Sequence, residues 1–174
     1  MKSDNIILIG FMGAGKSTVG RALTGYLPGW TMVDSDDVIS QKTGMTIPEI
    51  FANHGETYFR QVESEVIGEL MKKKRQIVAT GGGAVLVRAN REAMLAGGMV
   101  VALKAEAGVI VSRVRHDTNR PLLQGNIEER VAKIMQERKH AYDFADLIID
   151  TSHLTVDQVA RLVLEERERL INRK

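Results

Sequence analysis

Residues 10–17 (GFMGAGKS) have the types and spacing of a phosphate-binding loop and match the pattern G-x-x-x-x-G-K-[ST] at every fixed position. Glycines let backbone N–H groups turn toward phosphate oxygens, and the helix that follows directs its positive end at the same anion. In such a loop, Lys16 is expected to reach the β- and γ-phosphates and the Ser17 hydroxyl to ligate Mg²⁺. The loop predicts a bound nucleoside triphosphate. It does not identify a reaction, because GTPases, ATPases and several kinds of kinase share it.

Three aspartates, Asp34, Asp36 and Asp37, close and follow a short apolar segment at 31–34. If that segment is a strand of an open α/β sheet, its carboxyl end lies at the edge where ligands bind. Asp34 could hold Mg²⁺ through a water molecule, and Asp36 could orient a substrate hydroxyl or accept its proton. The alternative is that these carboxylates only cap the next helix, a role that we assign to Asp37.

A charged pair falls on the apolar face of a long helix predicted from Gly55 onward. At 100° per residue, Glu63 lies inside the apolar stripe and Arg60 lies at its edge. A buried carboxylate is costly, so we expect Arg60 to pair with it. The pair is either a structural ion pair or a device by which Glu63 aims Arg60 into a cleft.

Arg138 interrupts the apolar face of another predicted helix, at 127–145. Arginine is rarely buried without a partner. The side chain could form an internal salt bridge or extend its head to solvent. It could also bind an anionic ligand, because guanidinium matches carboxylate in a bidentate way. Two inward arginines beside a phosphate loop favour a small anionic acceptor.

Two further segments could contact ligands. Gly81, Gly82 and Gly83 follow a strand candidate at 76–80, and glycine lets a ligand approach the backbone closely, although a plain turn would look the same. Arg120 lies in the segment 116–126, which has no periodicity and is predicted to be a loop. Such a loop could close over the phosphates and exclude water.

The elements that must position these residues follow an alternating pattern, which indicates a parallel sheet covered by helices on both faces. The helix after the phosphate loop has clear periodicity, and Thr46-Ile47-Pro48-Glu49 is typical of a capping box at a helix start. The cluster at 72–75 (KKKR) suits a solvated helix C-terminus. A last helix is predicted at 155–173. The strands are predicted at 5–9, 31–34, 76–80, 99–103 and 147–150.

Composition narrows the possible functions. The chain has 174 residues, 44% hydrophobic and 26% charged, so one globular domain is expected. A formal net charge of +2 argues against bulk nucleic-acid binding. Without cysteine, disulfides and zinc–thiolate sites are excluded. No stretch approaches the roughly 20 apolar residues of a membrane helix, and the N-terminal apolar run is too short for a signal peptide, so a cytoplasmic location is expected.

Taken together, these motifs resemble those of the shikimate kinases. The similarity runs from residue 6 to about residue 151. Most of its specificity comes from the order of the Phe-Arg-x-x-Glu, triple-glycine and Arg-Pro-Leu-Leu motifs. The segments that carry it are residues 10–17, Asp34-Ser35-Asp36, Gly55-Glu56-x-x-Phe59-Arg60-x-x-Glu63, Gly81-Gly82-Gly83, Arg120-Pro121-Leu122-Leu123, Arg138-x-x-x-Tyr142 and Asp150-Thr151.

The resemblance implies a fold like that of the nucleoside monophosphate kinases. This is a single α/β domain over residues 1–174 with three layers, in which a five-stranded parallel sheet has helices on both faces. It also implies a substrate-binding region at about 35–62 and a mobile lid at about 113–126. The implied reaction transfers the γ-phosphoryl group of ATP, with Mg²⁺, to the 3-hydroxyl of shikimate, on the route to chorismate and aromatic amino acids. A monomer without nucleic-acid or membrane partners is expected.

The resemblance also implies roles for individual residues. The catalytic residues would be Lys16, Asp36 and Arg120. Magnesium would be held by Ser17 and, through water, by Asp34. ATP would contact Gly13, Ala14, Gly15, Lys16, Ser17, Thr18, Arg113 and Arg120. Shikimate would contact Asp36, Phe51, Phe59, Arg60, Gly81, Gly82, Gly83 and Arg138, with the two arginines on its carboxylate.

The sequence departs from the family pattern in two places. Lys139-His140-Ala141 stand where the family often has a proline, with little expected consequence. Ser152-His153-Leu154-Thr155 follow Asp150-Thr151 where a basic residue near the adenine is common, which leaves the adenine contacts on that side unassigned.

Three alternatives stay open from sequence. A gluconate-kinase-like enzyme would share the scaffold but would not need two arginines for a carboxylate. A nucleotide-binding regulatory module without turnover would be favoured by loss of Lys16, Asp36 or Arg120, yet all three are present. A GTPase is disfavoured, since the chain has no N-K-x-D motif.

Overall fold

The computed structural model describes residues 4–115 and 125–173. Five parallel strands form one sheet in the order β2-β3-β1-β4-β5. The strands are β1 (Asn5–Gly10), β2 (Thr31–Asp34), β3 (Gln76–Ala79), β4 (Met99–Lys104) and β5 (Leu147–Asp150). Each lies within one residue of its predicted bounds. The prediction of a five-stranded parallel sheet is therefore confirmed.

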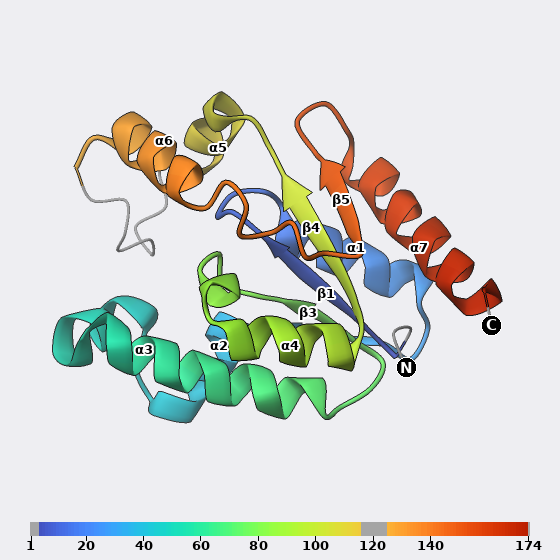
Figure 1. Cartoon of the computed structure of the whole chain (residues 1–174), viewed down its shortest axis with the longest axis horizontal. Helices are drawn as coiled ribbons and strands as arrows, with labels where there is room; N and C mark the ends of the chain where they lie inside the picture. The colour runs from blue at the N-terminus through green and yellow to red at the C-terminus, as the bar shows by residue number, and fades with distance from the viewer. Residues whose placement is uncertain (1–3, 116–124, 174) are drawn as a thin grey trace.

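The helices follow the strands in alternation (Figure 1). They are α1 (Lys16–Tyr26), α2 (Ser35–Thr43), α3 (Ile47–Met71), α4 (Arg88–Gly97), α5 (Ala107–Val114), α6 (Ile127–Glu137) and α7 (Val156–Asn172), with a short 3₁₀ turn η1 (Ala84–Leu86). Helices α4 and α5 had not been assigned from sequence. No helix within the described ranges is long and apolar enough to span a membrane.

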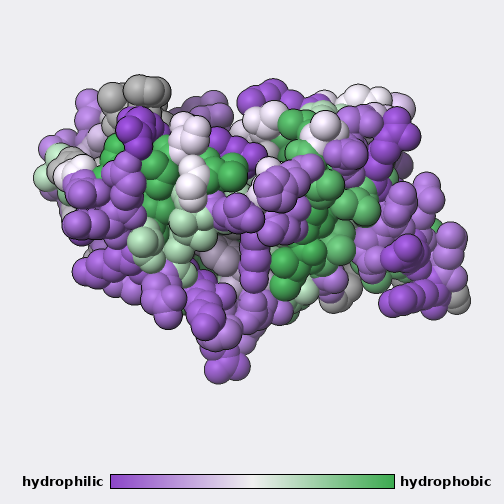
Figure 2. Space-filling view, turned by 90° about the horizontal axis from the view of Figure 1, so that it is seen from above, coloured by the Kyte–Doolittle hydropathy of each residue, from purple (hydrophilic) through white to green (hydrophobic). Residues whose placement is uncertain are grey.

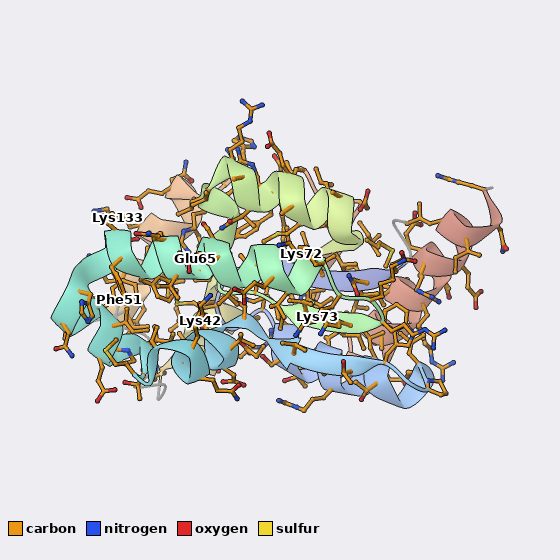
Figure 3. The ribbon with its side chains drawn as sticks, turned by 90° about the horizontal axis from the view of Figure 1, so that it is seen from below. Lys42, Phe51, Glu65, Lys72, Lys73 and Lys133 are labelled. Atoms are coloured by element: carbon orange, nitrogen blue, oxygen red, sulfur yellow. The ribbon has the colours of Figure 1, made fainter. Side chains whose placement is uncertain are left out.

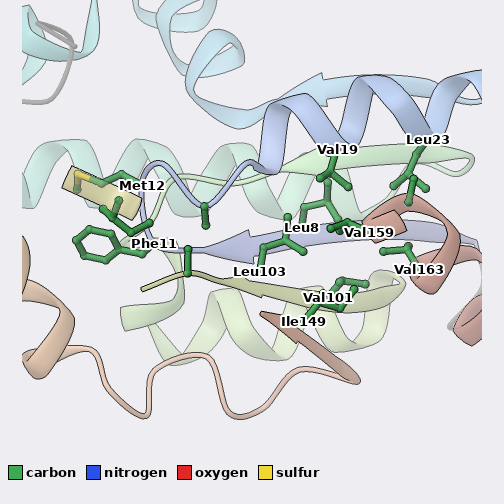
Figure 4. Close-up of a cluster of buried hydrophobic side chains, with 14 of the residues drawn as sticks. Leu8, Phe11, Met12, Val19, Leu23, Val101, Leu103, Ile149, Val159 and Val163 are labelled. Carbon is green, nitrogen blue, oxygen red and sulfur yellow. The ribbon is translucent and has the colours of Figure 1, made fainter. Parts of the chain in front are cut away.

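Side chains that alternate along the central strand reach opposite faces of the sheet. Ile6 and Leu8 of β1 belong to a buried cluster that also includes residues of α1 and α7, and Figure 4 shows Leu8 beside Leu103 and Val159. Ile7 and Ile9 pack instead with Ile67 of α3 and Met94 of α4. Helices therefore cover both faces, which gives the three layers expected for the fold.

A third buried cluster joins α2 and α3 to β3, through residues that include Ile39, Ile50, Phe59 and Val78. Most of the surface seen in Figure 2 is polar, with apolar side chains visible in places. Ile148 of β5 and Leu162 of α7 are among the large apolar side chains that stay exposed.

Helix α3 begins with the predicted capping box. Thr46 Oγ1 accepts a hydrogen bond from the Glu49 N–H at 3.3 Å, and the Glu49 carboxylate accepts one from the Thr46 N–H at 2.7 Å. The helix is interrupted at Gly55, where φ is +80°, so the capped first turns and the long segment meet at a bend. Figure 3 shows Phe51 near one end of α3 and Lys72 at the other.

Two local predictions were wrong. The helix predicted at 127–145 ends at Glu137, because Arg138 leaves helical geometry at φ −99° and ψ 14° and a series of turns follows. The cap of α2 is Asp34 and not Asp37. Helix α2 starts directly after β2, so Asp34 occupies the cap position, and its carboxylate accepts a hydrogen bond from the Asp36 N–H at 3.0 Å.

Candidate active site

The phosphate loop connects the central strand β1 to the N-terminus of α1, at the carboxyl edge of the sheet. Gly10 has φ +145°, and a Cβ atom there would lie 2.2 Å from the Leu103 carbonyl oxygen of β4. Gly15 caps α1 with φ +98°. Both positions require glycine, one for close packing on β4 and one for the left-handed turn into the helix.

Helix α1 presents an unshielded positive end to this loop. Its first turn contains no acidic residue, and no side chain within the described residues caps it. Backbone N–H groups at such a terminus bind anions readily. Lys16 is buried in the loop, where its ammonium donates hydrogen bonds to the carbonyl oxygens of Gly10 at 2.8 Å and Phe11 at 3.0 Å. The predicted phosphate-binding lysine therefore lies at the loop's centre.

Ser17 and Asp34, the two residues predicted to hold magnesium, are in direct contact. The Ser17 hydroxyl donates a hydrogen bond to Asp34 Oδ2 at 2.9 Å. Mg²⁺ prefers hard oxygen ligands and is commonly held by one or two protein groups together with water and substrate phosphates. No group of three or more His, Cys, Asp or Glu side chains gathers as a metal site within the ranges described. One hydroxyl and one carboxylate beside a phosphate loop fit magnesium that arrives with a nucleotide.

A cleft of about 570 Å³ opens along the phosphate loop. Its lining brings together most of the predicted nucleotide residues with part of the predicted acceptor set, namely Gly13, Gly15, Lys16, Ser17, Thr18, Asp34, Asp36, Gly81, Gly82 and Arg113. Six other lining residues had no individual site role assigned from sequence, and they are Asp37, Ser40, Thr46, Ile47, Pro48 and Thr80. The capping box at Thr46 marked the start of α3, but nothing in the sequence placed that helix start beside the nucleotide loop.

Arg113 and Thr151 hold the carbonyl oxygens of the phosphate loop from outside. Arg113 Nη1 donates a hydrogen bond to the Gly13 carbonyl oxygen at 2.9 Å, and Arg113 also lines the cleft. The buried Thr151 hydroxyl donates to the Ala14 oxygen at 3.2 Å. Both residues therefore help to set the loop backbone. Arg120, the predicted lid arginine, lies outside the described residues, as does most of the predicted lid.

The first glycine of the turn after β3 lies against two carboxylates. A Cβ atom on Gly81 would come within 2.9 Å of Glu63 Oε2 and 3.1 Å of Asp36 Oδ1. The Gly81 N–H donates to Ser35 Oγ at 3.3 Å, which ties the turn to the start of α2. Asp36 and Glu63, which are 27 positions apart, therefore lie close together across one glycine.

The next two glycines lie against the two predicted arginines. A Cβ atom on Gly82 would be 3.5 Å from Arg138 Nη1, and one on Gly83 would be 2.3 Å from Arg60 Nη2. Residues from α3, from the end of α6 and from the glycine turn thus converge at one place. The structure therefore places Arg60 and Arg138 beside adjacent glycines of the same turn.

Glu63 is a fully buried carboxylate on α3. Its Oε1 accepts a hydrogen bond from Arg60 Nη1 at 2.7 Å, while Arg60 also reaches Glu56 at 3.4 Å. Burial raises the pKa of Glu63 to about 7, and the negative charge of Asp36 acts in the same direction; Arg60 and Arg138 oppose the rise. Glu63 Oε2 has no hydrogen-bond partner within the part of the chain that the structure describes.

Arg138 caps the C-terminus of α6 and is only 7% exposed. Its Nη1 is buried and makes no hydrogen bond to any described residue. A buried guanidinium N–H without an acceptor is expensive, so an anionic ligand would satisfy it. The sequence left open that Arg138 forms an internal salt bridge, and Arg138 forms none within residues 4–115 and 125–173.

Phe51 and Phe59, the two aromatic residues expected to contact the acceptor, have ring centroids 4.9 Å apart. Arg60 Cζ lies 5.1 Å from the Phe59 centroid, within the range of a cation–π contact. These three residues, together with Gly83 and Arg138, are not among the described lining of the cleft. The residues predicted to bind the nucleotide and those predicted to bind the acceptor therefore meet at Asp36, Gly81 and Gly82.

Comparison with known proteins identifies the family. The family model described as "Shikimate kinase" matches residues 12–168. A shikimate kinase of Thermodesulfovibrio yellowstonii is 47% identical over 171 residues, covering 98% of each chain. The chain belongs to the shikimate kinase family.

Solved structures agree with that assignment. A shikimate kinase from Acinetobacter baumannii in complex with shikimate superposes with a TM-score of 0.90 at 39% identity, over 98% of this chain and 94% of that one. A gluconokinase from Sinorhizobium meliloti has a TM-score of 0.61 at 18% identity, over 97% and 94%. At that identity the gluconokinase shares the fold alone. The gluconate-kinase-like alternative therefore loses its support.

Proposed function

We propose that this protein transfers the γ-phosphoryl group of ATP to the 3-hydroxyl of shikimate, forming shikimate 3-phosphate and ADP. The observation that carries the proposal is the glycine turn. Gly81, Gly82 and Gly83 approach Asp36, Arg138 and Arg60 on one side, and two of the glycines line the phosphate-loop cleft on the other. A small acid with hydroxyl groups is the acceptor that such a set would recognise.

The donor side works by positioning and charge. Phosphoryl transfer has a loose transition state with charge spread over the phosphoryl oxygens, so little covalent chemistry is required of the protein. The N-terminus of α1 and the Lys16 ammonium would neutralise that charge. Lys16 now bonds to the carbonyl oxygens of Gly10 and Phe11, and these bonds would give way to bonds with phosphate.

Magnesium would be held by the Ser17 hydroxyl, with Asp34 acting through water. When bound, Mg²⁺ neutralises developing charge on the β- and γ-phosphates. Asp34 also caps α2, and its two carboxylate oxygens divide between the Asp36 N–H and the Ser17 hydroxyl. The same side chain would therefore fix the start of α2, and with it Asp36, relative to the metal site.

On the acceptor side, the guanidinium groups of Arg60 and Arg138 would bind the carboxylate, with Phe51 and Phe59 beside the ring. A carboxylate held at one end of the ring fixes which hydroxyl faces the phosphate loop. Asp36 would then orient the 3-hydroxyl or accept its proton. Arg120 of the proposed lid, at about 113–126, would close over the phosphates and exclude competing water.

We propose that residues at about 35–62 form the substrate-binding region and that one chain is sufficient for activity. In support of the first point, six residues between Asp36 and Pro48 line the cleft. Measuring the molar mass of the active protein by light scattering tests the second point, with one chain per particle expected.

The experiment that tests the function is an ADP-release assay with ATP·Mg²⁺ and a panel of acceptors. The panel holds shikimate, gluconate, nucleoside monophosphates and no acceptor. ADP release with shikimate alone is the expected result. Release with another acceptor would keep the nucleotide assignment and remove the arginine assignment. ATP binding without release would favour a regulatory module.

A further inference from the structure

The hydroxyl of Tyr142 has no role in the mechanism described above. Tyr142 lies in the turns that follow α6, and its side chain is 5% exposed. The ring packs in the buried cluster that includes Ile7, Ile9 and Met94, on the face of the sheet that α3 and α4 cover. Its Oη donates a hydrogen bond to the Gly82 carbonyl oxygen at 2.8 Å, across 60 positions of sequence.

This bond fixes the orientation of a whole peptide group. The Gly82 carbonyl and the Gly83 N–H belong to one planar trans peptide and point in opposite directions. Holding the oxygen therefore holds the N–H as well. Neither the Gly82 N–H nor the Gly83 N–H donates a hydrogen bond to a residue that the structure describes. In a run of three glycines the backbone itself restricts such a peptide least.

Tyr142 also lies beside Arg138. Burial raises the pKa of the Tyr142 phenol, and the Arg138 guanidinium opposes that rise through its charge and a hydrogen bond. The two residues are joined by a turn in which the Ala141 N–H donates to the Arg138 carbonyl at 3.0 Å. Arg138 Nη1, in turn, is 3.5 Å from where a Gly82 Cβ would lie. One hydroxyl thus contacts the glycine peptide and flanks the carboxylate-binding arginine.

We propose that Tyr142 is a positioning residue for the acceptor, holding the Gly82–Gly83 peptide so that the Gly83 N–H and the Arg138 guanidinium face the same bound acid. The inference rests on the proposed function, since it assumes that the acid is shikimate. A phenylalanine would fill the same space in the core but would release the peptide. The effect should therefore fall on acceptor binding and not on nucleotide binding.

The test is steady-state kinetics of Tyr142→Phe. We expect the KM for shikimate to rise about tenfold, which corresponds to about 1.4 kcal/mol, while the KM for ATP stays within twofold. Tyr26→Phe is the matched control, because it removes the hydroxyl of an exposed tyrosine. That hydroxyl donates a hydrogen bond to Asp157 between α1 and α7. Both KM values should be unchanged in that control.

The possible outcomes distinguish the role of Tyr142 from the proposed function on which it rests. A lower thermal midpoint with an unchanged KM for shikimate would make Tyr142 a structural anchor and overturn the inference. Wild-type protein that fails to phosphorylate shikimate would instead remove the proposed function, and the inference with it.

A second measurement does not depend on the folding of any variant. In ¹⁵N-labelled wild-type protein, the Gly83 amide proton should move downfield when shikimate is added, as a new hydrogen bond forms. A Gly83 signal that does not respond to saturating shikimate would contradict the proposal.

Discussion

Glu63 Oε1 and Arg60 Nη1 are 2.7 Å apart across one turn of α3, and the carboxylate has no exposed surface. The Arg60 side chain is 16% exposed. A buried anion thus holds a cation whose other nitrogen, Nη2, lies against Gly83. Both interpretations made from sequence require this contact, and the one in which Glu63 aims Arg60 into a cleft stays a prediction.

The first prediction concerns Glu63 and pH. Because the pKa is raised from 4.5 to about 7 in the folded protein, the stabilising contribution of the protonated group is complete below pH 4.5 and is lost as the pH rises through 7. Wild-type protein should lose roughly 3 kcal/mol of unfolding free energy over that window relative to Glu63→Gln. Denaturant unfolding of both proteins from pH 4.5 to 8 measures the difference. Parallel pH curves would show that the carboxyl titrates alike in both states.

The second prediction uses two glycines with different surroundings. An alanine Cβ at Gly83 would lie 2.3 Å from Arg60 Nη2, although the φ of −93° accepts alanine, so Arg60 must move. Gly83→Ala should raise the KM for shikimate tenfold or more, since a charged hydrogen bond is worth about 1.5–3 kcal/mol. Gly68→Ala in α3 is the control, because its Cβ meets nothing within 4 Å. Equal KM values for the two variants would separate Arg60 from the acceptor site.

The third prediction tests the other arginine. Arg138→Ala should raise the KM for shikimate by one to two decades while the KM for ATP changes little, because a charged hydrogen bond contributes about 1.5–3 kcal/mol. Arg88→Ala removes an exposed arginine that pairs with Glu92 at 2.7 Å in α4, and it should have no effect. An unchanged KM in Arg138→Ala would refute the carboxylate clamp.

The fourth prediction separates two neighbouring aspartates that both line the cleft. Asp36→Ala should abolish turnover and largely spare ATP binding, because Asp36 is proposed to act on the acceptor hydroxyl. Asp37→Ala, one position on, should keep most of the wild-type kcat. Single-turnover assays with calorimetric ATP titration test both effects. A kcat near the wild-type value in Asp36→Ala would remove the role given to that residue.

The sheet was predictable because its strands are almost continuous apolar segments. Residues of β1, β3 and β4 are buried on both faces, and strands of that kind contrast sharply with the polar and glycine-rich segments around them. The phosphate loop was predictable for a different reason. Its function depends on backbone geometry that only a fixed local pattern of glycines can provide, so the pattern is visible in eight consecutive residues.

The errors fall where tertiary contacts decide the backbone. The spacing of Arg138, Ala141 and Tyr142 continues the helical period, yet the chain leaves the helix at Arg138 and reaches the Gly82 carbonyl from a turn. The cap of α2 was misplaced by three residues because the helix follows β2 without a loop. The short helices α4 and α5 have too few turns for a clear period.

The site itself was only partly predictable. Sequence spacing placed Glu63 and Arg60 on one face, since a single helix carries both. It could not show that Gly83 lies against Arg60 or that Thr46, Ile47 and Pro48 border the nucleotide cleft. Those contacts depend on how α3 crosses the sheet, which no local pattern specifies.

The position of the transferred phosphoryl group tests the central claim most directly. The purified protein is incubated with ATP·Mg²⁺ and shikimate, and the product is examined by proton–phosphorus correlation NMR. We predict a single new phosphate ester whose phosphorus couples to the ring proton on carbon 3. Coupling to another ring proton would mean that the carboxylate clamp and Asp36 present a different hydroxyl, and inorganic phosphate alone would mean that the acceptor is not phosphorylated.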